Sequence, residues 1–165
     1  MAKHSLKVAK KDRLSDVGRT SMKGSVNPKS KMTFKKFVST EAPAAKKIDF
    51  IRSGVNACVV DDMVQYLGVS KTVIFGLLHT AESTAHKLIR DNRTLDSAAS
   101  ERVVRVADIT RTAEQTFGGR EAATRWLKTP NIALTGATPL SMLDTEPGAL
   151  EVRRILSSID YGGVL

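Results

Sequence analysis

The feature that most constrains this 165-residue chain is an apolar period of helical spacing that runs through its middle. Between residues 98 and 117, apolar side chains recur at i, i+3, i+4 and i+7, which places them on one side of a helix. The members of this stripe are Val103, Val106, Ala107, Thr110, Ala113 and Phe117. Gly118 and Gly119 follow, and glycine commonly ends a helix. The pattern predicts one long amphipathic helix that stops at the glycine pair.

Shorter helices are indicated on both sides of this segment. Apolar residues recur at helical spacing in residues 51–59 and 63–67. After the glycine pair, a short helix carries Trp126, which we expect to anchor the C-terminal half of the core, and it stops before Pro130. Aromatic residues make up only 5% of the chain, so the core must consist mainly of Ala, Val, Ile and Leu. Because that mix favours helices over sheets, we expect an all-α fold.

The last forty residues have the pattern of successive capped helices. In Thr138-Pro139 a capping residue precedes a proline at the helix start, and Thr145-Glu146-Pro147 repeats the arrangement. A final helix is expected over about residues 147–159. The residues that it should bury are Val152, Ile155, Leu156 and Ile159.

The stretch from Val64 to His79 has the layout of a helix-turn-helix. Gly68 suits a turn that needs a positive φ, and Ser70 is placed to cap the next helix. The inner side of that helix is expected to consist of Val73, Ile74, Leu77 and Leu78. The candidate DNA-binding residues, on its outer side, are Ser70, Lys71, Thr72, Phe75 and His79. The helix offers one Lys and no Arg, Asn or Gln to base edges, so the same pattern also fits a simple helix–helix corner.

The net charge of +9 is concentrated in the first part of the chain. Residues 1–47 contain thirteen Lys or Arg and three acidic residues, a net charge of +10, so the other 118 residues carry −1. This segment has few large apolar residues and scattered Gly, Ser and Pro. We therefore expect a basic, flexible arm. It either adds non-specific affinity for nucleic acid by releasing counterions or serves as a solvated extension.

Several functional classes are disfavoured by the residues that the chain lacks. Cys58 is the single cysteine, so an internal disulfide is impossible and a cytoplasmic location is expected. No apolar run approaches the roughly 20 residues that cross a membrane. His79, Glu82 and His86 have a spacing that suits a divalent metal, but solvated side chains are the expected interpretation. Without a phosphate loop, nucleophile elbow or paired carboxylates, we expect neither an enzyme nor a cofactor.

Residues 126–162 contain a series of spaced motifs. They are Trp126-Leu127, Pro130-Asn131, Ala133-Leu134, Gly136, Pro139-Leu140, Thr145, Gly148 and Tyr161-Gly162. Together they resemble the toxin-binding domain of Xre/MbcA/ParS antitoxins. Residues 95–117 are similar to the long helix that precedes this domain in the family, and Leu67-Gly68-Val69-Ser70 is similar to its Xre-like helix-turn-helix. The resemblance covers about residues 50–165.

The resemblance implies an antitoxin paired with a RES-domain toxin, an enzyme that destroys NAD⁺. Such an antitoxin would block the active site of the toxin. It would also repress its own operon by binding operator DNA as a homodimer within a toxin–antitoxin hetero-oligomer. The charge distribution and the resemblance together predict an arm over residues 1–47, a helix-turn-helix domain over 48–97 and a helical toxin-binding domain over 98–165. Recognition helices of the family often carry Arg where this chain is apolar, so neutralisation is better supported than repression. The alternative is a helix-turn-helix regulator without a toxin partner.

The end of the chain is the candidate toxin-binding site. Its residues are Asp160, Tyr161, Gly162, Gly163, Val164 and Leu165. An apolar end with two glycines is costly to leave in water and bends readily into a cleft. Its free carboxylate, or that of Asp160, is suited to pair with basic groups that hold the phosphates of NAD⁺. The alternative is a frayed terminus that contacts nothing.

Overall fold

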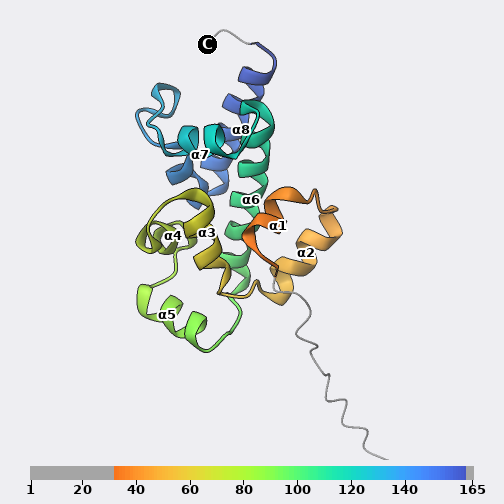
Figure 1. The fold of residues 1–165 in the computed structure, drawn as a ribbon, viewed down its shortest axis with the longest axis vertical. Helices are drawn as coiled ribbons and strands as arrows, with labels where there is room; N and C mark the ends of the chain where they lie inside the picture. Colours follow the sequence, from red (N-terminus) through yellow and green to blue (C-terminus); the bar gives the residue numbers. More distant parts are fainter. Residues whose placement is uncertain (1–31, 163–165) are drawn as a thin grey trace, which may run out of the picture.

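The computed structural model describes residues 32–162, which form an arrangement of helices without a sheet (Figure 1). The helices of the first part are α1 (Phe34–Ser39), α2 (Ala44–Ser53), α3 (Val59–Leu67), α4 (Lys71–Leu78) and α5 (Glu82–Arg90). The later elements are α6 (Ser97–Phe117), α7 (Arg120–Lys128), the 3₁₀ helices η1 (Ile132–Leu134) and η2 (Pro139–Asp144), and α8 (Glu146–Asp160). The all-α fold expected from the sequence is confirmed.

Helix α6 is the element around which the others are arranged (Figure 1). It packs against α1, α2, α4, α7, η2 and α8. The side chain of Asp96 caps its first turn by accepting a hydrogen bond from the Ala99 amide, and Gly118 ends it with a φ of 76°. The inward stripe is buried at Val103, Val106, Ala107, Thr110 and Ala113. The predicted long helix is therefore confirmed and begins at Ser97.

Helices α3 and α4 form the expected helix-turn-helix corner. Gly68 has a φ of 64° and donates its amide to Val64 O, which is the geometry that the turn requires. The hydroxyl of Ser70 accepts a hydrogen bond from the Val73 amide at 3.3 Å and caps α4.

The predicted register of α4 is wrong at two positions. Phe75, expected on the outer side, is only 3% exposed, and Val73, expected on the inner side, is 46% exposed. Helix α5 packs beside α4, and the ring of His86 meets the ring of Phe75 edge-on with 5.2 Å between the centroids. Because α5 covers this side of α4, the larger Phe75 is buried and the smaller Val73 lies in contact with solvent.

Residues 32–47, expected to belong to the basic arm, are part of the packed structure. Helix α1 packs on α3 and α6, and α2 packs on α6. The side chains that α1 buries are Phe34, Phe37 and Val38. The ammonium of Lys47 lies 2.7 Å from Asp108 Oδ2 on α6. The expectation of a flexible arm is wrong for residues 32–47, while residues 1–31 lie outside the described part of the chain.

The C-terminal half contains both capped starts predicted from the sequence. The hydroxyl of Thr138 accepts a hydrogen bond from Ser141 N, and the hydroxyl of Thr145 accepts one from Gly148 N. Two predictions of burial are wrong here. Trp126 is only partly buried beside Phe117, while Leu127 fills the core, and Ile159 is 41% exposed. Ile159 lies in the last turn of α8, which extends beyond the other helices, as Figure 1 shows.

No helix within residues 32–162 is long and apolar enough to cross a membrane.

Candidate DNA and protein interfaces

The outer side of α4 presents few groups that attract DNA. Ser70 and Thr72 are exposed, but the ammonium of Lys71 lies 2.7 Å from Asp61 Oδ1 on α3. Lys71 is the only cationic residue of α4. Because Asp61 offsets its charge, the electrostatic attraction of α4 for phosphate is weak.

A groove of about 360 Å³ lies between the outer side of α4 and η2. Its lining residues are Thr72, Val73, Gly76, Leu77, Thr138, Leu140, Ser141 and Asp144. Asp144 is the only charged residue among them, so the groove carries no cation that would meet a phosphate. The outer side of α4 is therefore bounded by the C-terminal half of the molecule.

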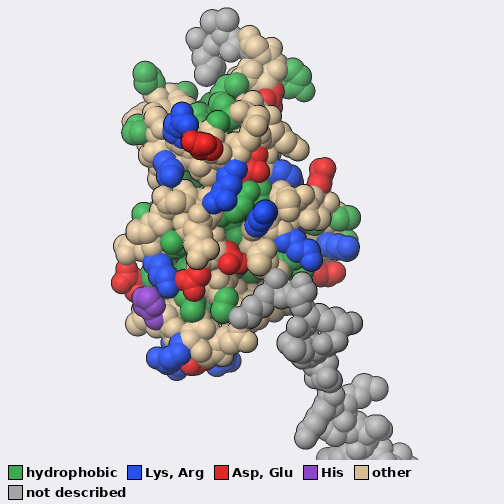
Figure 2. Space-filling model, viewed as in Figure 1, with side chains coloured by type: hydrophobic (Ala, Val, Ile, Leu, Met, Phe, Trp, Pro, Cys, Tyr) green, Lys and Arg blue, Asp and Glu red, His purple; other side chains and the backbone are tan. Residues whose placement is uncertain are grey.

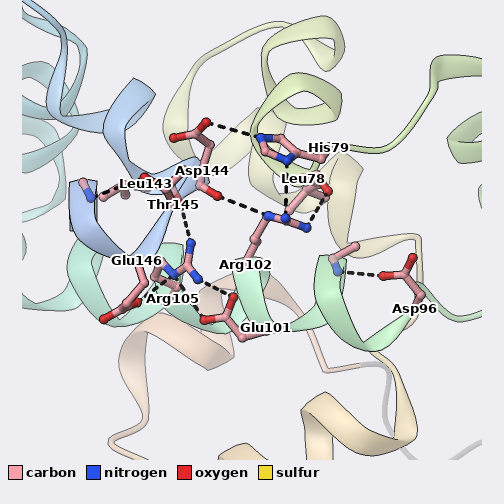
Figure 3. A network of polar contacts seen from close by, with 12 residues as sticks. Leu78, His79, Asp96, Glu101, Arg102, Arg105, Leu143, Asp144, Thr145 and Glu146 are labelled. Atoms are coloured by element: carbon pink, nitrogen blue, oxygen red, sulfur yellow. Dashed lines mark hydrogen bonds and ion pairs between the residues drawn. The ribbon is translucent and has the colours of Figure 1, made fainter. Parts of the chain in front are cut away.

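His79, expected to point outward from α4, is held in a polar network at the end of that helix (Figure 3). Arg102 on α6 donates to Leu78 O at 3.3 Å and to Asp144 O at 3.2 Å, and its Nη2 lies 3.3 Å from His79 Nδ1. His79 Nε2 lies 3.3 Å from Asp144 Oδ2. The tautomer that satisfies both contacts accepts at Nδ1 and donates from Nε2. These contacts join α4 to η2. They occupy both ring nitrogens of His79, which would have to leave these partners to bind a DNA base.

Arg105, one turn further along α6, fixes the start of α8 (Figure 3). Its side chain is 9% exposed and donates to Leu143 O at 3.2 Å. The same guanidinium pairs with Glu101 and lies 3.1 Å from Glu146 Oε2 at the first turn of α8. A buried guanidinium needs this full set of acceptors because an unpaired buried charge is costly.

The Thr145 and Gly148 motif has a direct steric basis. A Cβ at Gly148 would lie 2.1 Å from Met142 O, closer than any real Cβ contact, so only glycine fits. Thr145 caps the same turn through its hydroxyl. The motif therefore sets how closely η2 and α8 approach each other.

The end of α8 is exposed where the sequence placed the toxin-binding site. Asp160 lies in solvent, Tyr161 is 90% exposed, and Gly162 has a φ of 63°. Figures 1 and 2 show this end projecting from the body of the molecule. Gly163, Val164 and Leu165 lie outside the described residues.

His79 and His86, two of the three residues with metal-compatible spacing, make different contacts. His79 faces Asp144, whereas His86 packs its ring against Phe75. Within residues 32–162, no group of three or more His, Cys, Asp or Glu side chains is placed to hold a metal.

Two known domain families match most of the described chain. Residues 47–108 match the Antitoxin Xre-like helix-turn-helix domain, and residues 112–162 match the Antitoxin Xre/MbcA/ParS C-terminal toxin-binding domain. The two matched segments meet within α6, so this helix contributes to both.

Curated relatives from several bacteria are similar to this chain. The Prs ADP-ribosylating antitoxin of Sphingobium sp. (strain YBL2) is 31% identical over 130 residues, which is 73% of this chain and 82% of that protein. An Antitoxin Xre of Yersinia enterocolitica is 29% identical over 120 residues, 70% of this chain and 78% of the relative. An Antitoxin Xre of Pseudomonas putida is 37% identical over 79 residues, 48% of this chain and 50% of the relative.

Proposed function

The chain belongs to the Xre/MbcA/ParS family of antitoxins, and we propose that it binds a RES-domain toxin that degrades NAD⁺ and blocks the active site of that toxin. The observation that carries this proposal is the projecting end of α8 within a segment that matches a toxin-binding domain. A helix end that stands clear of its own core is sterically suited to enter the cleft of another protein.

Residues 160–165 are the part proposed to enter the NAD⁺ pocket. Asp160 provides a negative charge that would pair with the cationic groups which bind NAD⁺ phosphates. Arg105 and Glu146 hold the first turn of α8 against α6, so the position of its C-terminal end is fixed before a partner binds. A helix end that is already fixed loses less entropy on binding.

The chemistry of the toxin has two candidates. The name of the Sphingobium relative refers to ADP-ribosylation, a reaction that uses NAD⁺ as the donor of ADP-ribose. Hydrolysis of NAD⁺ releases free ADP-ribose, whereas ADP-ribosylation attaches it to an acceptor. Residues 160–165 bound in the NAD⁺ pocket would inhibit both reactions, because both use NAD⁺ as substrate. Chromatography of the products, with and without acceptor proteins, distinguishes them.

Co-expression with the product of the neighbouring gene tests the proposed partnership. We expect a RES-domain protein to co-purify with this chain and to consume NAD⁺ only when the chain is absent. The purified chain alone is expected to leave NAD⁺ unchanged. If no toxin is encoded nearby and none co-purifies, the alternative of a regulator without a toxin partner is supported instead.

A second proposed activity is repression of its own operon as a homodimer, which the match to a helix-turn-helix domain favours. Ser70, Lys71, Thr72 and His79 are the residues of the proposed DNA contact that stay accessible, whereas Phe75 is buried. Replacing Lys71 and Thr72 together with Ala should weaken operator binding and leave toxin inhibition unchanged. Full repression by this double variant would show that the α3–α4 corner is structural.

Residues 1–31 are proposed to supply most of the non-specific attraction for DNA. They contain nine Lys or Arg and two Asp, a net charge of +7. Deleting them should reduce the slope of log K against log salt by about 0.9 for each phosphate that the arm no longer neutralises. An unchanged slope would contradict this role.

A further inference from the structure

The most exposed large apolar side chain of the described chain belongs to neither of the two sites discussed so far. Ile132, on η1, is 96% exposed. It stands in a stretch of fifteen residues, 129–143, that contains no Asp, Glu, Lys, Arg or His, although 26% of the whole chain is charged. The exposed members of this stretch are Thr129, Pro130, Ile132, Ala133, Thr135, Gly136 and Ser141.

The loop that carries Ile132 is held in one conformation. Asn131 N donates to Ala137 O at 3.0 Å, Gly136 N donates to Asn131 O at 3.0 Å, and Asn131 Oδ1 accepts from Ala133 N at 2.9 Å. Leu134 lies beneath the loop and is 5% exposed. A closed loop of this kind holds Ile132 outward by its own hydrogen bonds and loses little entropy when a partner covers it.

We propose that Ile132 and the uncharged loop around it form a second toxin contact, in which Ile132 fills an apolar pocket on the surface of the toxin. This inference rests on the proposed toxin partnership and adds a contact separate from residues 160–165. Ile132 falls within residues 112–162, the segment that matches the toxin-binding domain. Figure 1 shows the η1 loop at the same end of the molecule as the end of α8, and in Figure 2 hydrophobic side chains protrude there.

The composition of the loop points to a protein partner. A DNA contact needs cations for phosphate, and residues 129–143 contain none. Depletion of charge around a central apolar anchor is typical of the core of a protein–protein interface. One apolar anchor on a rigid loop can therefore contribute to the affinity and selectivity for a cognate toxin.

Titration calorimetry with the purified RES-domain product of the neighbouring gene tests this contact. The full-length chain is compared with Ile132→Ser, with the conservative Ile132→Val and with Ile48→Ser as a matched control. Ile48 is an exposed isoleucine on α2, 45% exposed, and lies outside the toxin-binding match. Thermal unfolding of Ile132→Ser should equal that of the unmodified chain because the side chain has no place in the core.

We expect Ile132→Ser to raise the dissociation constant about tenfold to a hundredfold, the effect of removing one buried aliphatic side chain. The dissociation constants of Ile132→Val and Ile48→Ser should stay within about threefold of that of the unmodified chain.

If the unmodified chain binds the toxin and Ile132→Ser binds it equally well, the inference is overturned and the proposed function is left intact. Failure of the unmodified chain to bind overturns both. A change in the mass of the free antitoxin without a change in toxin affinity assigns Ile132 to contact between copies and also overturns it.

Discussion

Helices α4 and α8 each contain a glycine, and the two glycines have opposite surroundings. At Gly148 in α8, an added Cβ would lie 2.1 Å from Met142 O, whereas at Gly76 in α4 it would meet no atom within 4 Å. Gly148 lies at the corner where η2 and α8 meet, and Gly76 lines the open groove beside α4. The same residue type therefore marks a close backbone approach in one helix and free space in the other.

The two helices are therefore suited to different kinds of binding. The η2–α8 corner has one allowed geometry, so it presents the end of α8 in a defined direction. The outer side of α4 has space, and its single Lys is paired with Asp61. Shape complementarity can therefore govern binding at the C-terminal end, whereas attraction of DNA requires charge from another part of the chain.

The substitution Gly148→Ala should have the largest effect on stability. Its methyl group would force η2 away from α8, at a cost of about 3 kcal/mol in the free energy of unfolding. Urea denaturation measures this change. A decrease below about 1 kcal/mol would show that the corner relaxes easily and would remove the contrast with α4.

The substitution Arg105→Met should cost about 2 kcal/mol, because it removes the donor to Leu143 O and the partner of Glu101, and leaves Glu146 with Arg153 alone. Arg153→Met is the matched control, since Arg153 forms a more exposed pair with Glu146 and its removal should cost less than about 1 kcal/mol. Equal effects of the two substitutions would contradict a special role for the buried guanidinium.

Alkaline unfolding tests how firmly the helix-turn-helix half is attached to α6. Burial, together with the hydrogen bond that the Tyr66 hydroxyl donates to Glu114, raises the pKa of Tyr66 from 10.0 to about 12. The folded state therefore holds this proton more tightly than the unfolded state. The resulting stability is present below pH 10 and is lost as the pH rises through about 12. We expect a decrease of about 1 kcal/mol after allowance for solvent screening, and Tyr66→Phe should abolish this component.

The substitution Gly76→Ala should have the smallest effect and the opposite sign. Alanine favours the helix, and the space at this position accepts a methyl group, so the free energy of unfolding should rise by about 0.5–1 kcal/mol. Thermal denaturation measures the increase. Destabilisation by this substitution would show that the groove beside α4 is less open than the structure indicates.

Local signals in the sequence predicted much of the fold. The stripe along α6, the turn at Gly68, and the caps at Ser70, Thr138 and Thr145 depend on neighbouring residues alone, and all are present. Sequence reasoning failed where another element decides burial. Phe75 is buried because α5 covers it, and Ile159 is exposed because α8 extends past its neighbours.

The first helix and the η1 loop show two other limits of local signals. Helix α1 has only six residues and is too short to be stable alone, so it depends on packing against α3 and α6. Ile132 was missed as a candidate binding residue because its exposure depends on the closed loop around it. The uncharged run of residues 129–143 is the signal in the sequence that would have identified this surface.

The most direct test of the proposed inhibition by residues 160–165 is the rate of NAD⁺ consumption by the purified toxin. This rate is measured at increasing concentrations of the full chain and of a chain that ends at Asp160. We expect the full chain to abolish NAD⁺ loss, whereas the shortened chain should still form the complex but no longer protect NAD⁺. Inhibition by the shortened chain as strong as that by the full chain would place the block on the helices of residues 120–159. Undiminished NAD⁺ loss in the presence of excess full chain would contradict the proposed antitoxin function itself.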